Sequence, residues 1–220
     1  MEFPSHDPLN DYTPREERLN VISHATGLGL SILGLVLLVL RSWNSEQKLH
    51  LVSFVIFGAS MILLYAASTF YHNCRRTALR FRLKILDHAS IYILIAGTYT
   101  PFSLITLKGS GGWILFTVVR SFALLGVLLK LFFTGRFRLL STAIYVLMGW
   151  LMVFAIKPLM ENLPLPGLYW VLAGGISYTL GAVLYSIRKI PFNHAIFHFF
   201  VLVGTFCHFV AVYEFVLPKG

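Results

Sequence analysis

The chain alternates long apolar stretches with short polar connections. Seven stretches are free or nearly free of charged residues: 19–40, 49–71, 88–107, 111–129, 139–156, 166–187 and 192–213. Each holds roughly 18 to 25 residues, the length that a helix needs to cross the hydrocarbon core of a bilayer. The pattern therefore predicts an all-α, polytopic membrane protein, a seven-transmembrane-helix bundle. Because the connections are short, we expect consecutive helices to run antiparallel.

The first residues of the chain differ in character from the rest. Residues 1–18 are polar, which predicts an N-terminal tail ahead of a transmembrane domain over 19–217. The tail lacks the basic start and short apolar core of a secretory signal. The whole chain is 57% hydrophobic and 12% charged, against about 25% charged residues in soluble proteins, which excludes an ordinary soluble domain. Cys74 and Cys207 lie in very different surroundings, so we expect no disulfide between them.

The basic residues of the connections predict the orientation of the helices, because loops on the cytoplasmic side carry most lysines and arginines. Twelve fall in the tail and after the second, fourth and sixth segments: Arg15, Arg18, Arg75, Arg76, Arg80, Arg82, Lys84, Lys130, Arg136, Arg138, Arg188 and Lys189. Five fall on the other side: Arg41, Lys48, Lys108, Lys157 and Lys219. The N-terminus is therefore expected in the cytoplasm and the C-terminus outside. This distribution suits anionic lipid headgroups and excludes a nucleic-acid partner.

Two histidines stand out in the last apolar segment. His194 and His198 are four residues apart, so on a helix they share one face. Lipid offers them no water, so polar side chains at such depth usually face the interior of the bundle. The same spacing lets two imidazoles hold one divalent metal ion. The alternative is a pair of core histidines bonded to neighbouring helices.

Other predicted helices carry polar residues at the same depth as this pair. All lie within about 11 Å, two helical turns, of the predicted cytoplasmic boundary. They are Asn20, Ser23 and His24 in the first segment, Ser68 and His72 in the second, and Asp87 and His88 at the start of the third. Scattered core histidines would not agree in depth, so the layer favours a metal site.

The residue types in this layer suit zinc. Three neutral imidazoles, from His72, His194 and His198, leave a fourth position open, as in catalytic zinc sites. Zinc lowers the pKa of a bound water to about 7 and polarises carbonyl groups. Asp87 is expected to orient that water, take its proton or anchor an imidazole, and Ser68 to hydrogen-bond the water or the substrate. A Ser68–His72 nucleophile pair is the alternative, although no third residue orients it.

Four further polar residues lie in the predicted helices. Because His88 points about 100° away from Asp87 on a helix, we expect Asp87 alone to face the site. His24 is a candidate for contact with the ligands, or a packing residue. His208 lies about 15 Å along the helix from His198, so it belongs to the far half of the cavity or to the core. Arg120 lies deep in the fourth segment and is expected to face the bundle or a wet cavity. There it would snorkel, bond backbone carbonyls, or hold a lipid carboxylate or phosphate.

These residues also carry a family resemblance. The motifs, in chain order, are Glu16-Glu17-Arg18-Leu19-Asn20 with His24, Ser68-Thr69-Phe70-Tyr71-His72, Asp87-His88, Ala96-Gly97-Thr98-Tyr99-Thr100-Pro101, and His194-Ala195-Ile196-Phe197-His198 with His208. Together they resemble the hemolysin III family, the bacterial branch of the progestin and adiponectin Q receptors (PAQR). The resemblance covers nearly the whole chain from about residue 16.

The resemblance implies a seven-helix bundle in the bacterial inner membrane with an intramembrane zinc ion on His72, His194 and His198, and with Ser68 and Asp87 beside its water. Adiponectin receptors of the family are associated with hydrolysis of the amide of ceramide, and the bacterial branch with haemolysis and membrane lipid homeostasis. The leading hypothesis is a zinc-dependent hydrolase of a lipid amide or ester. The alternatives are a membrane sensor or receptor with structural zinc, a pore-forming cytolysin and a transporter.

Overall fold

The computed structural model describes residues 12–134, 136–187 and 189–217, and this part of the chain is helical almost throughout. Its elements are α1 (Pro14–Ser42), α2 (Lys48–Asn73), α3 (Thr77–Pro101), η1 (Phe102–Thr106), α4 (Gly112–Phe133), α5 (Arg138–Gly149), η2 (Trp150–Ala155), α6 (Ile156–Asn162), α7 (Leu165–Ser186) and α8 (Asn193–Phe215). Seven helical stretches of this part are long and apolar enough to cross a membrane. The predicted all-α, seven-helix membrane bundle is confirmed; its orientation in the membrane stays a prediction.

Two of the seven spans are composite helices. The third continues from α3 into η1, a π-helical turn that follows Pro101. Proline lacks an N–H and its ring crowds the preceding turn, and a wider turn relieves both problems. The fifth joins α5, the 3₁₀ turn η2 and α6 into one stretch, Leu139–Asn162. It therefore extends six residues beyond the predicted 139–156.

The first helix begins before the apolar pattern does. α1 starts at Pro14, inside the predicted tail, and Thr13 caps it by accepting a hydrogen bond from the backbone N–H of Glu16 at 3.2 Å. Thr13-Pro14-Arg15-Glu16 has the sequence of a capping box with proline at the first helical position. Residues 14–18 are thus helical, and the first turn carries Glu16 and Glu17. The remaining tail residues 1–11 lie outside the described part, as do Arg188 and Lys219.

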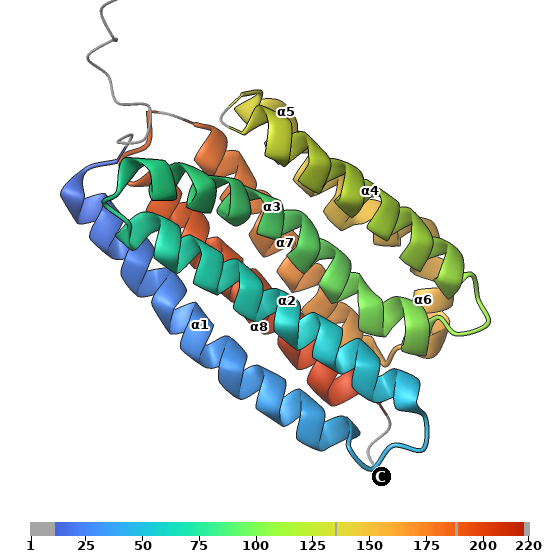
Figure 1. Cartoon of the computed structure of the whole chain (residues 1–220). Coiled ribbons are helices and arrows are strands. Elements are labelled where there is room, and N and C mark those ends of the chain that lie inside the picture. Colours follow the sequence, from blue (N-terminus) through green and yellow to red (C-terminus); the bar gives the residue numbers. More distant parts are fainter. Residues whose placement is uncertain (1–11, 135, 188, 218–220) are drawn as a thin grey trace, which may run out of the picture.

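The helices pack so that the helix ends that carry the predicted polar layer meet at one end of the bundle (Figure 1). α1 packs on α2 and α8, α2 on α3, α3 on α4, and α7 on α8. The starts of α1, α3 and α8 and the end of α2 lie together, at the upper end of the view in Figure 1. We call this the histidine end, because it holds His72, His194 and His198. The end of α4 and the start of α5 lie toward the same end.

The interior of the bundle is closely packed and its outside is apolar. Tyr65, Phe54 and Phe57 of α2 are almost fully buried. Gly97 of α3 lies so close to α2 that a methyl group in its place would overlap Ser60. Large apolar side chains cover the outer faces, with Phe154 89% exposed, as expected of a surface that faces lipid. Cys74 and Cys207 are both free.

Candidate metal centre

Three buried histidines converge at the histidine end. His72 lies in the last turn of α2, and His194 and His198 in the first two turns of α8. One ring nitrogen from each lies within 4.8 Å of the other two, and the Nε2 atoms of His72 and His194 are 3.1 Å apart. The structure thus brings together the three histidines that the sequence placed in one layer. A buried cluster of this kind can hold a metal ion.

Oxygen atoms from α1 hold the far side of two of these rings. Glu17 Oε2 lies 2.6 Å from Nδ1 of His72, and Ser23 Oγ lies 3.4 Å from Nδ1 of His198. An ionised carboxylate only accepts hydrogen bonds, so we assign the proton of His72 to Nδ1. The Nε2 lone pair of His72 then faces the centre of the cluster. Such a carboxylate–histidine pair is the usual outer support of a histidine that binds a metal.

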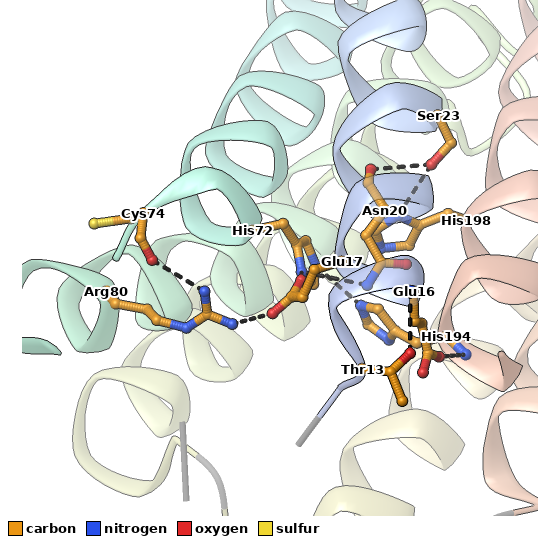
Figure 2. A network of polar contacts seen from close by, with 10 residues as sticks. All are labelled: Thr13, Glu16, Glu17, Asn20, Ser23, His72, Cys74, Arg80, His194 and His198. Atoms are coloured by element: carbon orange, nitrogen blue, oxygen red, sulfur yellow. Dashed lines mark hydrogen bonds and ion pairs between the residues drawn. The ribbon is translucent and has the colours of Figure 1, made fainter. Parts of the chain in front are cut away.

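Glu17 is itself held from the other side (Figure 2). Arg80 of α3 donates a hydrogen bond from Nη2 to Glu17 Oε1, and a second from Nη1 to the Cys74 carbonyl at 3.0 Å. Figure 2 shows Glu17 between His72 and Arg80, so one carboxylate joins α1, α2 and α3. Sequence reasoning did not select Glu17 as a site residue. Its spacing of three from Asn20 and seven from His24, which is one face of a helix, was the available signal.

The start of α1 also covers the start of α8. The ring of Tyr12 stacks on His194, with centroids 4.6 Å apart and planes at 23°. Glu16 Oε1 accepts a hydrogen bond from the backbone N–H of His194 at 3.4 Å. Both residues belong to the segment predicted as a tail. The N-terminal segment is therefore part of the site and not only a leader to the first span.

Asp87 and Ser68 lie beside the cluster. Asp87 is 7% exposed and interacts electrostatically with His72, and Ser68 of α2 lies next to it. The Ser68 side chain is fully buried, and the Asp87 carboxylate is its hydrogen-bonding neighbour. Both Asp87 and His88 line the cavity described below. Lining this cavity is not the same as facing the three histidines, so the expectation that Asp87 alone faces the metal site stays a prediction.

His24 and His208 occupy two levels of the same cavity. His24 stacks on His198 with ring centroids 3.5 Å apart and planes at 9°. His208 donates from Nδ1 to the Gly204 carbonyl at 2.9 Å and stacks on Tyr178. His24 therefore touches a cluster histidine, whereas His208 lies farther along α8 and is held by its own helix.

Arg120 lies elsewhere. Its Nη2 donates to Thr100 Oγ1 at 3.1 Å, and its guanidinium lies 4.3 Å from the centre of the Phe116 ring. Arg120 is not among the described residues that line the cavity discussed below. Arg120 thus joins α4 to α3 through the Thr100 hydroxyl and lies over the Phe116 ring of its own helix, where the sequence suggested a carbonyl or a lipid anion.

A cavity of about 450 Å³ opens from the histidine cluster into the bundle. Asp87, His194 and His198 line its first part, and Tyr178 and His208 its middle. It continues to Met160 and Leu165, where α6 ends and α7 begins. Most of its other wall residues are apolar, so the cavity offers a polar head region and a long apolar region.

Comparisons with known proteins agree with this arrangement. Residues 12–209 match the family model described as Haemolysin-III related. The chain is 46% identical to Hemolysin-3 of Bacillus cereus over 94% of each chain. It is 47% identical to the Hemolysin-3 homolog of Bacillus subtilis (strain 168), over 91% of this chain and 94% of that protein. A more distant relative is the human Monocyte to macrophage differentiation factor, 25% identical over 91% of this chain and 84% of that protein.

These matches span nearly the whole length of the chain, including all seven spans except the last turns of α8. With the seven apolar helices, they identify a multi-pass membrane protein and indicate the bacterial inner membrane as its location. The chain therefore belongs to the haemolysin III family, with more distant relatives of the PAQR type.

Proposed function

We propose that this protein is a zinc-dependent hydrolase that cleaves an amide or ester bond of a membrane lipid and so takes part in membrane lipid homeostasis. One observation is the main support for this proposal. The cluster of His72, His194 and His198 lies at the head of a cavity that also contains Asp87 and is otherwise largely apolar. A metal ion, a carboxylate and an acyl chain would then share one site.

The donor set supports zinc as the metal. Three imidazole nitrogens and no thiolate are the ligands of many catalytic zinc sites, which keep a fourth position for water or substrate. The Glu17 carboxylate and the Ser23 hydroxyl on the Nδ1 atoms supply the outer contacts that such sites need. A bound zinc ion supplies Lewis acidity, which activates water and polarises a substrate carbonyl.

Residues of the chain would then handle the proton and the substrate. Asp87 would accept a proton from the attacking water and pass it to the leaving amine or alcohol as the bond from the carbonyl carbon breaks. The hydroxyl of Ser68, beside Asp87, would donate to the water or to the carbonyl oxygen. Water adds its oxygen to the acyl group, so the products are a carboxylic acid and an amine or alcohol.

The proposal is tested with a panel of lipids and purified protein. We expect the zinc-loaded protein to release a free fatty acid from at least one lipid amide or ester, as measured by mass spectrometry of the extracted lipids. Chelator-treated protein should release none, and added zinc should restore the release. Zinc-loaded, folded protein that releases no acyl chain from any lipid of the panel would contradict the hydrolase assignment.

A Glu17→Gln variant should bind zinc more weakly, by about 10- to 100-fold, the usual cost of removing an outer carboxylate. Glutamine keeps the shape of Glu17 but loses the charge that supports His72 and pairs with Arg80. The affinity is measured by competition with a zinc-binding dye. Glu46→Gln, at an exposed glutamate outside the spans, is the matched control. Equal zinc affinities of the two variants would show that Glu17 does not contribute to metal binding.

The names of the bacterial relatives support a second candidate function. Two relatives are called Hemolysin-3 or a homolog of it, which makes a pore-forming cytolysin the alternative to a hydrolase. Leakage of a trapped dye from liposomes distinguishes the two. Leakage at stoichiometric protein, unaffected by chelator, would favour the cytolysin, whereas the hydrolase requires chelator-sensitive release of fatty acid.

A further inference from the structure

A buried lysine borders the cavity at the histidine end. Lys130 of α4 is 5% exposed, and its Nζ donates to Ser141 Oγ at 2.6 Å. Its ammonium group also lies 5.8 Å from the centre of the Tyr145 ring. An ammonium group has three donors, and Ser141 accepts one. Among the described residues Lys130 forms no ion pair, so its charge and the rest of its donors are available to a ligand.

Other cations surround the same part of the cavity. Lys84 of α3 and Arg136, after α4, line the cavity together with Lys130. Lys84 and Lys130 both lie close enough to His88 to interact with it electrostatically. Asp87 interacts with Lys84 but also with His72, so one carboxylate serves two partners. This part of the cavity wall therefore carries three basic residues, Lys84, Lys130 and Arg136.

A second pocket lies between these basic residues and the outside of the bundle. It has a volume of about 200 Å³, and Lys130, Arg136 and Ser141 line it as well as the main cavity. Leu129, Phe133 and Leu140 form its outer wall and are 40%, 44% and 58% exposed. Such apolar residues face the acyl chains of a bilayer. Lys130 therefore lies between the lipid-facing surface and the cavity.

A buried cation is costly when it has no counter-charge. Lysine and arginine together are the usual partners of phosphate and carboxylate groups, to which they donate short, charge-assisted hydrogen bonds. We propose that Lys130, with Lys84 and Arg136 beside it, forms an anion-binding site for a phosphate or carboxylate group at the entrance to the cavity. The site does not depend on hydrolysis, because it involves none of the residues assigned to the metal or to proton transfer.

The test measures binding without turnover, on detergent-purified full-length protein treated with chelator. The probes are 1-acylglycerol phosphate, the neutral 1-acylglycerol with the same chain, and inorganic phosphate. Wild-type protein should bind the phosphorylated lipid at least about 10-fold more tightly than the neutral one, the effect of hydrogen bonds to a charged group. Equal affinity for the two lipids in the wild type overturns the proposal, and this comparison needs no variant.

Variants then test whether Lys130 causes the preference for the phosphorylated lipid over the neutral one. Lys130→Met keeps the length of the side chain without its charge and should remove most of the preference. Lys130→Arg should retain it, as should Lys108→Met, which changes an exposed lysine bonded to Gln47 between η1 and α4. A preference that survives unchanged in a folded Lys130→Met protein contradicts the proposal. Binding of inorganic phosphate, lost in Lys130→Met, identifies a free anion as the ligand; binding of the phosphorylated lipid alone identifies a lipid headgroup.

Discussion

Replacing both His194 and His198 with alanine is expected to remove the metal from the protein, from about one zinc ion per chain to almost none. The reason is that these two residues supply two of the three converging nitrogens, and His72 alone holds a metal ion far too weakly. The metal content is measured by mass spectrometry on detergent-purified protein. His208→Ala is the matched control, because it removes another buried imidazole of α8 that lies outside the cluster.

Two outcomes of this experiment would change the interpretation. A folded wild-type protein without metal would leave the three histidines as helix packing or as a proton-linked switch. A double variant that keeps its metal would show that the metal binds at other residues.

Thermal melting distinguishes a catalytic metal from a structural one. A large loss of stability with chelator, without any lipid hydrolysis, would indicate a structural metal that ties α2 to α8, as in a membrane sensor.

An Asp87→Asn variant is expected to lose lipid hydrolysis by about 100- to 10,000-fold, the usual contribution of a general base, while keeping its metal. Asparagine has the shape of aspartate but cannot accept a proton at neutral pH. Because Asp87 is buried beside His72 and Ser68, no water-exposed carboxylate can replace it easily. The rate of fatty-acid release and the metal content are measured on the same preparation.

The control for this variant is Glu161→Gln, at an exposed carboxylate of α6, which should hydrolyse lipid at the wild-type rate. An unchanged rate of hydrolysis in Asp87→Asn would show that Asp87 does not act as the general base. Loss of metal together with activity would instead give Asp87 a role in holding the cluster. The two measurements together therefore separate proton transfer from metal binding.

Much of the fold could be predicted because a membrane simplifies the relation between sequence and structure. A spanning helix must be apolar over its whole length, so the seven spans are visible as seven uncharged stretches. The misplaced boundaries fall where polar residues continue a helix, as at Thr13 and Pro14, or where a span changes its helical geometry, as at η2. At these points the apolar pattern carries no information, and capping or local geometry decides.

The sequence also determined the depth of the histidines, because a helix rises by a fixed 1.5 Å per residue. His72, His194 and His198 could be placed in one layer from their positions in their segments. The sequence did not determine which neighbours each ring would meet. The bond from Glu17 to His72, the stack of Tyr12 on His194 and the position of Lys130 between two pockets depend on how the helices rotate and pack. These contacts join residues far apart along the chain, and the packing of all the helices together fixes the rotation of each, so only the tertiary structure could decide them.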